Sequence, residues 1–445
     1  MTDAKFQQMT TSRVEKLILQ MSGPTITIML VSAMYNVADT YFVSFLGTQA
    51  TAALGVAFSL MAIIQATGFF FGNGAGNYIS RALGARNSAG AIKMAATGFF
   101  TAFVTGTLAA ILGLTFLEPL ARLLGATETI LPYTMEYLRY VVIGMPFMIC
   151  AFMLNNCLRF QGNTFWSMVG MTSGAILNVV LDPIFIFTFN WGMTGAALAT
   201  LISQMFSFGL LLWLSCTQKE NLPIVPREFT PTLKTYKEIV RGGTPSMLRQ
   251  TLLSVSTIFI IHAAGSFGDA AIAAISIVMR IIQFLNAAML GLAQGFQPVC
   301  GFNFGAQLYD RVKQAYWFCV KLVLGILSTL AVICLICAPQ IISIFKINDP
   351  RVVEIGALTL RMQCLTLPLA GWIIIDNMLL QMLGKVMSAS LLSLARQGLF
   401  LMPLVFVLVY YFGLWGLQIA MPIADTLTFV LAVYLSSGTL RRDLS

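Results

Sequence analysis

Charged side chains are scarce in this chain of 445 residues. Asp, Glu, Lys and Arg together make up 10% of the sequence, whereas 58% of the residues are hydrophobic. A water-soluble protein carries about a quarter charged residues. A chain with so little charge cannot cover a water-facing surface of this size. The composition therefore excludes an ordinary soluble protein and predicts that lipid surrounds most of the chain.

Residue sets for catalysis or metal binding are also missing. The chain has one histidine, His262, and it lacks HExxH, GxSxG and Cys/His motifs. We therefore expect neither an enzyme nor a resident cofactor. No acid is spaced to orient His262, so we interpret it as a polar packing residue, with a proton relay as the alternative.

The eight cysteines do not predict a disulfide framework, because all of them lie in or at the edge of apolar stretches. Cys334 and Cys337 form a CxxC, but no second pair or histidine is near it, so we interpret the pair as packing residues. The segment Met1 to Gln20 is polar and amphipathic. It lacks the apolar core of a signal peptide, and we expect no removable leader.

Long apolar runs dominate the sequence. A helix needs about 20 apolar residues to cross a bilayer. About twelve windows qualify, centred near residues 33, 65, 105, 144, 176, 205, 252, 286, 325, 365, 400 and 425. These runs lack the period-two alternation of barrel strands. We predict an all-α polytopic membrane protein with about twelve transmembrane helices.

Basic residues in the loops predict the orientation of the chain. The loops on one side carry most of the lysines and arginines, and Arg159 is counted with them. The loops on the other side carry only Arg122, Lys346 and Arg351. Since basic loops stay on the cytoplasmic side, both termini should be cytoplasmic. The net charge of +9 is scattered through these short loops, so we expect no nucleic-acid partner.

The two halves of the sequence repeat at a constant offset of 221 residues. The matching landmarks are Pro24 and Pro245, Gly47 and Gly268, Gly84 and Gly305, Asn156 and Asn377, and Gly192 and Gly413. An even number of spans in each half gives both copies the same orientation. We predict an N-terminal six-helix lobe at residues 1–216, a cytoplasmic linker at 217–235 and a C-terminal six-helix lobe at 236–445.

Small residues recur at the spacing that lets helices pack closely in lipid. Gly68, Gly72 and Gly76 form two overlapping GxxxG steps, and two further pairs in the second half are Gly291 with Gly295 and Gly301 with Gly305. Packing alone explains these faces, and we assign them no contact with a substrate.

Carboxylates inside predicted spans are functional candidates, because a charge in the bilayer is unfavourable. Those most deeply placed are Asp39, Asp182, Asp376 and Asp425. The first, fifth and sixth spans contain no lysine or arginine to neutralise Asp39 or Asp182. In the second half, the bases available for Asp376 and Asp425 are Arg249, Arg280, Lys321, Arg361 and Arg396.

Asn178 precedes Asp182 by four residues, so the two side chains share one helix face. Pro24 and Pro183 disturb helix bonding near the two aspartates and free backbone carbonyls. Such an all-oxygen environment suits a hard cation or a titrating proton. We predict that Asp39 and Asp182 handle a cation or proton. Pairing with a distant base, or capping of a kinked helix, is the alternative.

Six segments show a family resemblance when taken in order. They are Gly23-Pro24, 36–40, 45–47, 178–183, 295–298 and 301–306. With them the chain resembles the multidrug and toxic compound extrusion (MATE) family over essentially its whole length. The resemblance implies a bacterial inner-membrane antiporter, functional as a monomer. It would export structurally diverse organic cations by alternating access as Na⁺ or H⁺ enters.

The resemblance also implies particular residues. Prokaryotic members have a cation site that matches Asp39, Asn178, Asp182 and Thr200, so a bound Na⁺ or H⁺ is expected there. Pro24 matches the proline at which the first helix bends. We expect the substrate cavity to include Tyr35, Asn36, Tyr137, Asn156 and Asp376, with tyrosine rings attracting organic cations.

The chain departs from one pattern of the family. NorM-like members carry a glutamate in the seventh span, eight residues after its proline, together with an aspartate in the tenth span. Asp376 matches the aspartate, but Leu253 occupies the position of the glutamate. The resemblance therefore favours the DinF-like branch, in which carboxylates of the N-terminal lobe do the coupling.

Other protein classes fit less well. A lipid-linked oligosaccharide flippase of the same superfamily would need several basic residues in its cavity, and the first half has only Arg139 near membrane depth. A major-facilitator carrier would have an aspartate in the loop after the second span, and Arg81 to Arg86 lacks it. A receptor or scaffold has little use for buried carboxylates without partners.

Overall fold

The computed structural model describes residues 3–218, 220–344 and 349–442, so Lys346 lies outside the described residues. Helices make up nearly all of this part of the chain, and it contains no strand. The predicted all-α fold is confirmed.

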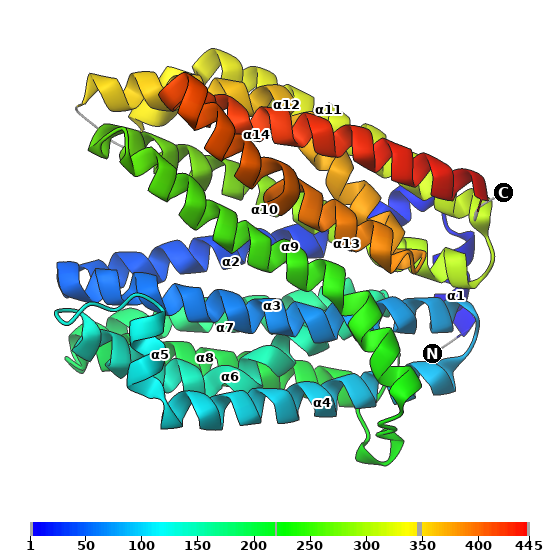
Figure 1. The fold of residues 1–445 in the computed structure, drawn as a ribbon. Coiled ribbons are helices and arrows are strands. Elements are labelled where there is room, and N and C mark those ends of the chain that lie inside the picture. Colours follow the sequence, from blue (N-terminus) through cyan, green and yellow to red (C-terminus); the bar gives the residue numbers. More distant parts are fainter. Residues whose placement is uncertain (1–2, 219, 345–348, 443–445) are drawn as a thin grey trace.

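The first group of helices is formed by the first half of the chain (Figure 1). In order, its elements are α1 (Asp3–Thr11), α2 (Val14–Ser44), α3 (Thr48–Gly84), α4 (Ser88–Thr115), α5 (Leu117–Leu123), α6 (Leu131–Phe160), α7 (Thr164–Pro183), a π-helical segment (Ile184–Thr188) and α8 (Gly192–Thr217).

The second group follows a connecting segment that contains one 3₁₀ turn (Pro226–Glu228). Its elements are α9 (Leu233–Gly265), α10 (Asp269–Gly305), α11 (Tyr309–Ser343), α12 (Pro350–Met382), α13 (Val386–Leu394), a π-helical segment (Ala395–Phe400) and α14 (Leu401–Arg442).

Within the described residues, eleven helices are long and apolar enough to cross a membrane. The last of them, Val386–Leu440, has 55 residues and contains both of the last two predicted spans. Gly413 interrupts it with a backbone conformation (φ 57°, ψ −135°) that glycine adopts readily and other residues avoid. The prediction of about twelve spans is therefore confirmed.

The backbone repeats the 221-residue offset of the sequence. Helices α3 and α10 both have 37 residues. Positive φ angles recur at equivalent turns: Gly47 and Gly268 precede these two helices, and Arg86 and Gln307 follow them. The duplication thus preserves the sharp turns as well as the helix lengths.

The two groups lie side by side and are joined mainly by α2 against α10 and α3 against α9 (Figure 1). Helices α6 and α12, which are equivalent in the repeat, are the most enclosed. Buried residues make up 83% and 56% of their most apolar windows. Residues on these two helices are therefore the best placed to form an interior site.

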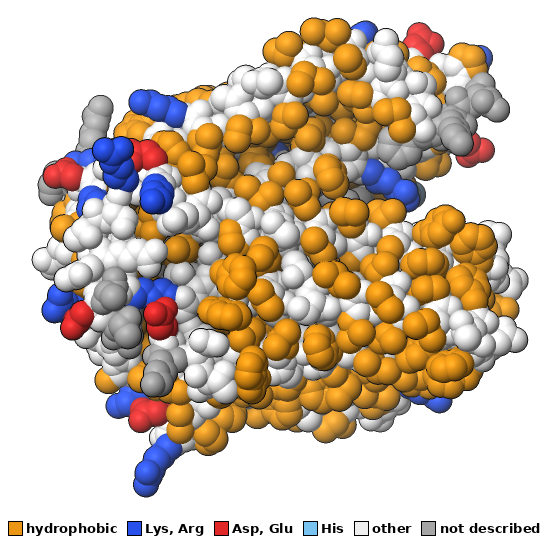
Figure 2. Space-filling model, turned by 180° about the vertical axis from the view of Figure 1, so that it is seen from behind, with side chains coloured by type: hydrophobic (Ala, Val, Ile, Leu, Met, Phe, Trp, Pro, Cys, Tyr) orange, Lys and Arg blue, Asp and Glu red, His pale blue; other side chains and the backbone are white. Residues whose placement is uncertain are grey.

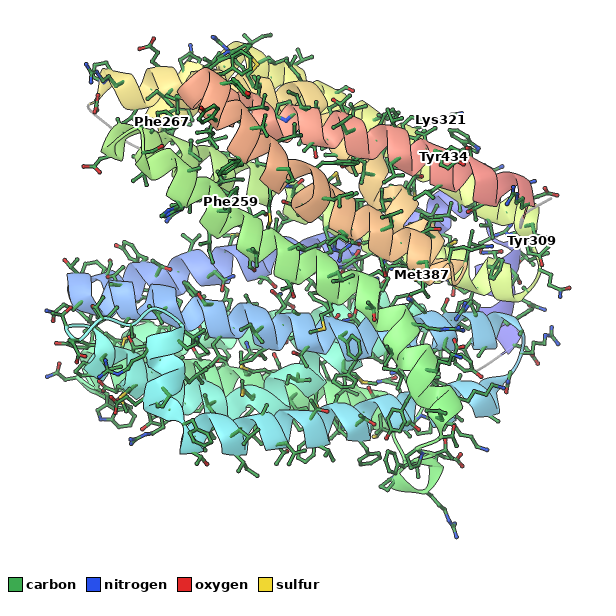
Figure 3. The ribbon with its side chains drawn as sticks, viewed as in Figure 1. Phe259, Phe267, Tyr309, Lys321, Met387 and Tyr434 are labelled. Carbon is green, nitrogen blue, oxygen red and sulfur yellow. The ribbon has the colours of Figure 1, made fainter. Side chains whose placement is uncertain are left out.

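Helix α1 and the last turn of α14 lie at the same end of the molecule, which we call the terminal end (Figure 1). Lys and Arg gather at this end, and the surface is hollowed between the two groups at the opposite end (Figure 2). The side-chain view shows the two ends of the second group: Phe267 lies near the opposite end, and Tyr309 and Met387 lie near the terminal end (Figure 3). The groups thus enclose a cleft that is open only away from the termini.

Glycines bring the groups together at the terminal end. A Cβ added to Gly84 would overlap the main-chain oxygen of Phe302, and one added to Gly305 would overlap that of Arg81. These two contacts are equivalent under the repeat. The packing role predicted for the small residues is confirmed at Gly305, whose lack of a side chain lets α10 approach α3.

Candidate cation site in the first helix group

Four side chains predicted to handle a cation come together inside the first group. Asp39 extends from α2, Asn178 and Asp182 from α7, and Thr200 from α8. Each is at most 2% exposed. Three helices that are separated in the sequence thus place two carboxylates, an amide and a hydroxyl in one interior position.

The local sequence of α7 shapes one side of this site. Asn178 and Asp182 lie one turn apart and face the same way. Pro183 ends the regular α-helix, and the π-helical segment Ile184–Thr188 follows it directly. Proline lacks the amide hydrogen that the α-helical ladder needs, so the widened turn starts where that hydrogen is missing.

Asn178 links the carboxylate of Asp182 to Thr200. Its Nδ2 lies 3.3 Å from Asp182 Oδ1 and 3.3 Å from Thr200 Oγ1. With the amide turned over, its nitrogen donates to Asp182 Oδ2 at 3.1 Å and its oxygen accepts from the main-chain N–H of Thr200 at 3.3 Å. In both orientations the amide nitrogen is directed at the Asp182 carboxylate.

Tyr137 closes the site from α6. Its hydroxyl donates to Asp39 Oδ2 at 3.2 Å and lies 3.2 Å from Thr200 Oγ1. The residue is 0% exposed. The sequence analysis expected Tyr137 to offer its ring to a substrate, whereas the structure uses its hydroxyl to connect Asp39 to Thr200.

Hydrogen-bonding capacity is left over inside the site. Asp39 Oδ1 is buried and has no hydrogen-bond partner, and the same holds for Ser203 Oγ and Gln204 Oε1 on α8. Buried polar atoms are nearly always paired, so an unpaired carboxylate oxygen marks a place where a ligand is expected. The hydrogen-bond partners that the structure gives Asp39 and Asp182 are all neutral.

The donor set fits a hard monovalent cation or a proton. It offers carboxylate, amide, hydroxyl and phenol oxygens, which are the ligands that hard cations prefer. The described residues contain no group of three or more His, Cys, Asp or Glu side chains that could hold a metal ion. A transition-metal centre therefore has no ligand set in this part of the chain.

A family model described as MatE matches residues 24–184 and 245–407 of the chain. The two matches begin 221 residues apart, which is the offset of the repeat. The chain belongs to the MatE family.

Individual relatives of this MatE chain extend the match to nearly its full length. "Multidrug export protein MepA" of Staphylococcus haemolyticus is 30% identical over 95% of this chain and 93% of its own length. MepA of Staphylococcus saprophyticus is 29% identical over 100% and 98%. A structure of the outward-facing conformation of a multidrug resistance MATE family transporter of the MOP superfamily is 26% identical, has a TM-score of 0.93 and covers 99% of both chains.

The other first-half residues predicted for the substrate cavity are placed as follows in this MatE chain. Tyr35 is half-buried and lies near Thr200 and Gln204. Asn36, one residue further along α2, is exposed. Tyr35 thus borders the cation site, and Asn36 faces away from its interior. Contact of either residue with a substrate stays a prediction.

Asp376 forms a separate buried site in the second group. Its Oδ1 accepts a hydrogen bond from the Tyr316 hydroxyl at 2.7 Å, and Trp372 Nε1 donates to that hydroxyl at 3.0 Å. Its Oδ2 is buried without a partner. Leu253, the residue on which the DinF-like prediction rests, is 41% exposed on α9.

Asp425 has the basic partner that the sequence made available. Arg396 Nε donates to Asp425 Oδ1 at 2.7 Å, and their side chains are 13% and 5% exposed. The pair lies within the second group, between its π-helical segment and α14. A structural role explains Asp425, whereas His262 is exposed at the end of α9 and its role stays open.

The sequence analysis missed Arg159. It counted this residue with the cytoplasmic loops, but the structure places it in the last turn of α6 with 1% of its surface exposed. Asn156, predicted for the substrate cavity, accepts a hydrogen bond from Arg159 Nη2 at 2.6 Å. The missed signal was Asn156 and Arg159, which lie one turn apart on a helix that is otherwise apolar.

Proposed function

We propose that this chain is a cation-coupled antiporter that exports organic cations, with Asp39 and Asp182 as the coupling carboxylates. The observation that carries the proposal is the buried pair itself. Two carboxylates on α2 and α7 have only neutral hydrogen-bond partners, and one oxygen of Asp39 has none. A negative site of this kind needs a positive ligand, and Na⁺ or H⁺ supplies the charge without needing much space.

The transport cycle follows from the arrangement of the two groups. With both termini in the cytoplasm, as the basic loops predict, the cleft of this structure opens outward (Figure 2). Binding of Na⁺ or H⁺ from outside would favour the inward-open state, and binding of drug would favour the outward-open state. Each ligand must prefer one of the two states, because a ligand that binds both equally shifts nothing.

The comparisons support multidrug efflux as the activity. Relatives that match 93% to 98% of their own length are named multidrug export proteins. All residues of the cation site come from one chain, so the proposal needs a single copy. Drug-like organic cations are the substrate class that the negative site would attract.

The test is efflux of ethidium from vesicles of known orientation. A Na⁺ gradient and a pH gradient are imposed separately on wild type, Asp39→Asn and Asp182→Asn. Asp269→Asn is the matched control, because Asp269 is exposed at the start of α10. We expect one gradient to drive wild-type and Asp269→Asn efflux and both site variants to lose it.

The same experiment contradicts the proposal in two ways. If Asp39→Asn and Asp182→Asn retain gradient-driven efflux at the wild-type rate, the carboxylates do not couple transport. If neither gradient moves ethidium or a panel of other cations through the wild-type protein, the substrate class is wrong.

A further inference from the structure

Arg159 connects the two helix groups with one guanidinium. Its Nη1 donates into the second group, to the main-chain oxygen of Gln294 at 2.8 Å and to Gln297 Oε1 at 2.7 Å. Its Nη2 donates into the first group, to Asn73 Oδ1 at 3.0 Å and to Asn156 Oδ1 at 2.6 Å. Each terminal nitrogen therefore serves one of the two groups.

The hydrogen bonds continue from Asn73 across the interface. Asn73 Nδ2 donates to Ser246 Oγ on α9 at 2.9 Å, and Ser246 Oγ donates to Gln381 Oε1 on α12 at 3.1 Å. Gln381 Nε2 donates to Asn377 Oδ1 at 2.6 Å. Arg159 thus starts a buried polar chain that runs from α6 through α3 into α9 and α12.

The acceptors of the Arg159 hydrogen bonds are all neutral. The charge is supported by the carbonyl end of α6, at whose last turn Arg159 lies, and by the ring of Phe160, whose centroid is 4.4 Å from the guanidinium carbon. A buried ion pair is hard to open, because separation leaves an unpaired charge. Bonds to neutral acceptors can be exchanged for bonds to water at a smaller net change.

We propose that Arg159 is a positioning residue of the transport cycle. It holds the two helix groups together at the terminal end in this conformation and releases them when the cleft reverses. The inference rests on the alternating access of the proposed function, but it does not depend on which ion is coupled or which drug is carried.

The cation site and this contact share two helices. Tyr137, which bonds Asp39, lies on α6 with Arg159, 22 residues away, or roughly 33 Å along a helix. Asp39 lies on α2 with Thr25, whose hydroxyl donates to the main-chain oxygen of Gly291 in the second group at 2.6 Å. A change at the cation site therefore has two direct connections to the interface at the terminal end.

The experiment measures distances between spin labels in lipid nanodiscs without an ion gradient. Labels at Ala89 and Asp310 report the terminal end, and labels at Thr48 and Asp269 report the opposite end. Each pair is exposed and equivalent under the repeat. The eight cysteines are first replaced. In Arg159→Gln we expect the population with a long Ala89–Asp310 distance to rise roughly tenfold and the Thr48–Asp269 distance to shorten.

Matched variants separate this role from loss of charge. Arg139→Gln removes the same charge from an exposed position at the other end of α6, and we expect wild-type distances. Arg159→Lys keeps the charge but cannot contact both groups with two terminal nitrogens, so it should behave like Arg159→Gln. If Arg159→Gln does not fold, Gln297→Leu removes one acceptor on the second group and should shift the populations in the same direction.

Wild-type distance distributions in folded Arg159→Gln or Gln297→Leu would overturn the proposal, and so would an equal shift in Arg139→Gln. Asp39→Asn distinguishes a failure here from a failure of the proposed function. If Asp39→Asn loses coupled efflux while Arg159→Gln leaves the distances unchanged, the antiporter stands and the gating role of Arg159 falls.

Discussion

Asn73 and Gln294 occupy equivalent positions in the two halves, 221 residues apart, and both accept a hydrogen bond from Arg159. Asn73 uses its side chain, and Gln294 uses its main-chain oxygen. The position equivalent to Arg159 itself is Leu380. The duplication therefore supplies matching places on α3 and α10, whereas the bridging base belongs to the first copy alone.

Gly305→Ala should weaken the closed interface at the terminal end. A Cβ there would overlap the main-chain oxygen of Arg81, and a backbone atom cannot turn aside as the end of a side chain can. Overpacking of this kind costs about 1–3 kcal/mol. We expect a lower temperature of thermal unfolding in detergent and a larger population with a long Ala89–Asp310 distance.

The matched control for that substitution is Gly325→Ala. Gly325 lies within α11, and nothing approaches the position of an added Cβ within 4 Å. Alanine is favoured over glycine in a helix by about 1 kcal/mol, so Gly325→Ala should be neutral or stabilising. Equal destabilisation by both substitutions would contradict the close contact between α10 and Arg81.

Asp425→Asn should destabilise the second group more than it affects transport coupling. It leaves the Arg396 guanidinium buried without its carboxylate, and removal of one partner of a buried ion pair costs about 3–5 kcal/mol. The double substitution Arg396→Met/Asp425→Leu removes both charges and should restore most of the unfolding temperature. A double variant as unstable as Asp425→Asn would show that the residues act independently.

The periodicity and length of the apolar runs were enough to predict the helices and the duplication. Asp39, Asn178 and Asp182 could be singled out because carboxylates are rare in lipid-facing sequence. Thr200 was predicted only through the resemblance, since a hydroxyl on an apolar helix carries no signal of its own. The hydroxyl role of Tyr137 depends on how α6 packs against α2, which the sequence does not encode locally.

Arg159 shows the limit of counting basic residues. Its place near the end of a helix made it look like a loop residue, because the rule counts residues near helix ends without knowing which way they point. Tertiary packing decides instead that this side chain turns inward between α3 and α10. The asymmetry with Leu380 was visible in the repeat and marks the position as one where the halves differ.

Tyr137→Phe should impair coupling without unfolding the protein. The substitution keeps the ring and removes the hydroxyl that joins Asp39 to Thr200. A hydrogen bond to a charged group contributes about 1.5–3 kcal/mol, so we expect the initial rate of gradient-driven ethidium efflux to fall roughly tenfold. Tyr140→Phe on the next turn of α6 is the control, and it should match wild type. An unchanged rate in Tyr137→Phe would remove this hydroxyl from the coupling site.

The docking of α1 should depend on pH through Lys5. This side chain is 6% exposed, and its Nζ lies 3.8 Å from Glu220. Burial lowers the pKa of Lys5 from 10.5 to about 8, even though Glu220 acts in the opposite direction. Between these values the undocked helix binds more protons than the docked one, so docking strengthens as pH rises from about 8 toward 10.5.

The measurement is the mobility of a spin label at Gln8, which is exposed on α1 while its neighbour Met9 is buried. We expect the mobile fraction to fall as pH rises from 7.5 to 9.5 in the wild type. Lys5→Met carries no proton to release, so its mobile fraction should stay constant over this range. Lys16→Met, which changes an exposed lysine on α2, should keep the wild-type response. A pH response that survives in Lys5→Met would mean that another group controls the docking of α1, since the remaining contacts of the helix, from Asn303 to Met9 and from Arg311 to Ser12, are made to main-chain oxygens that do not titrate.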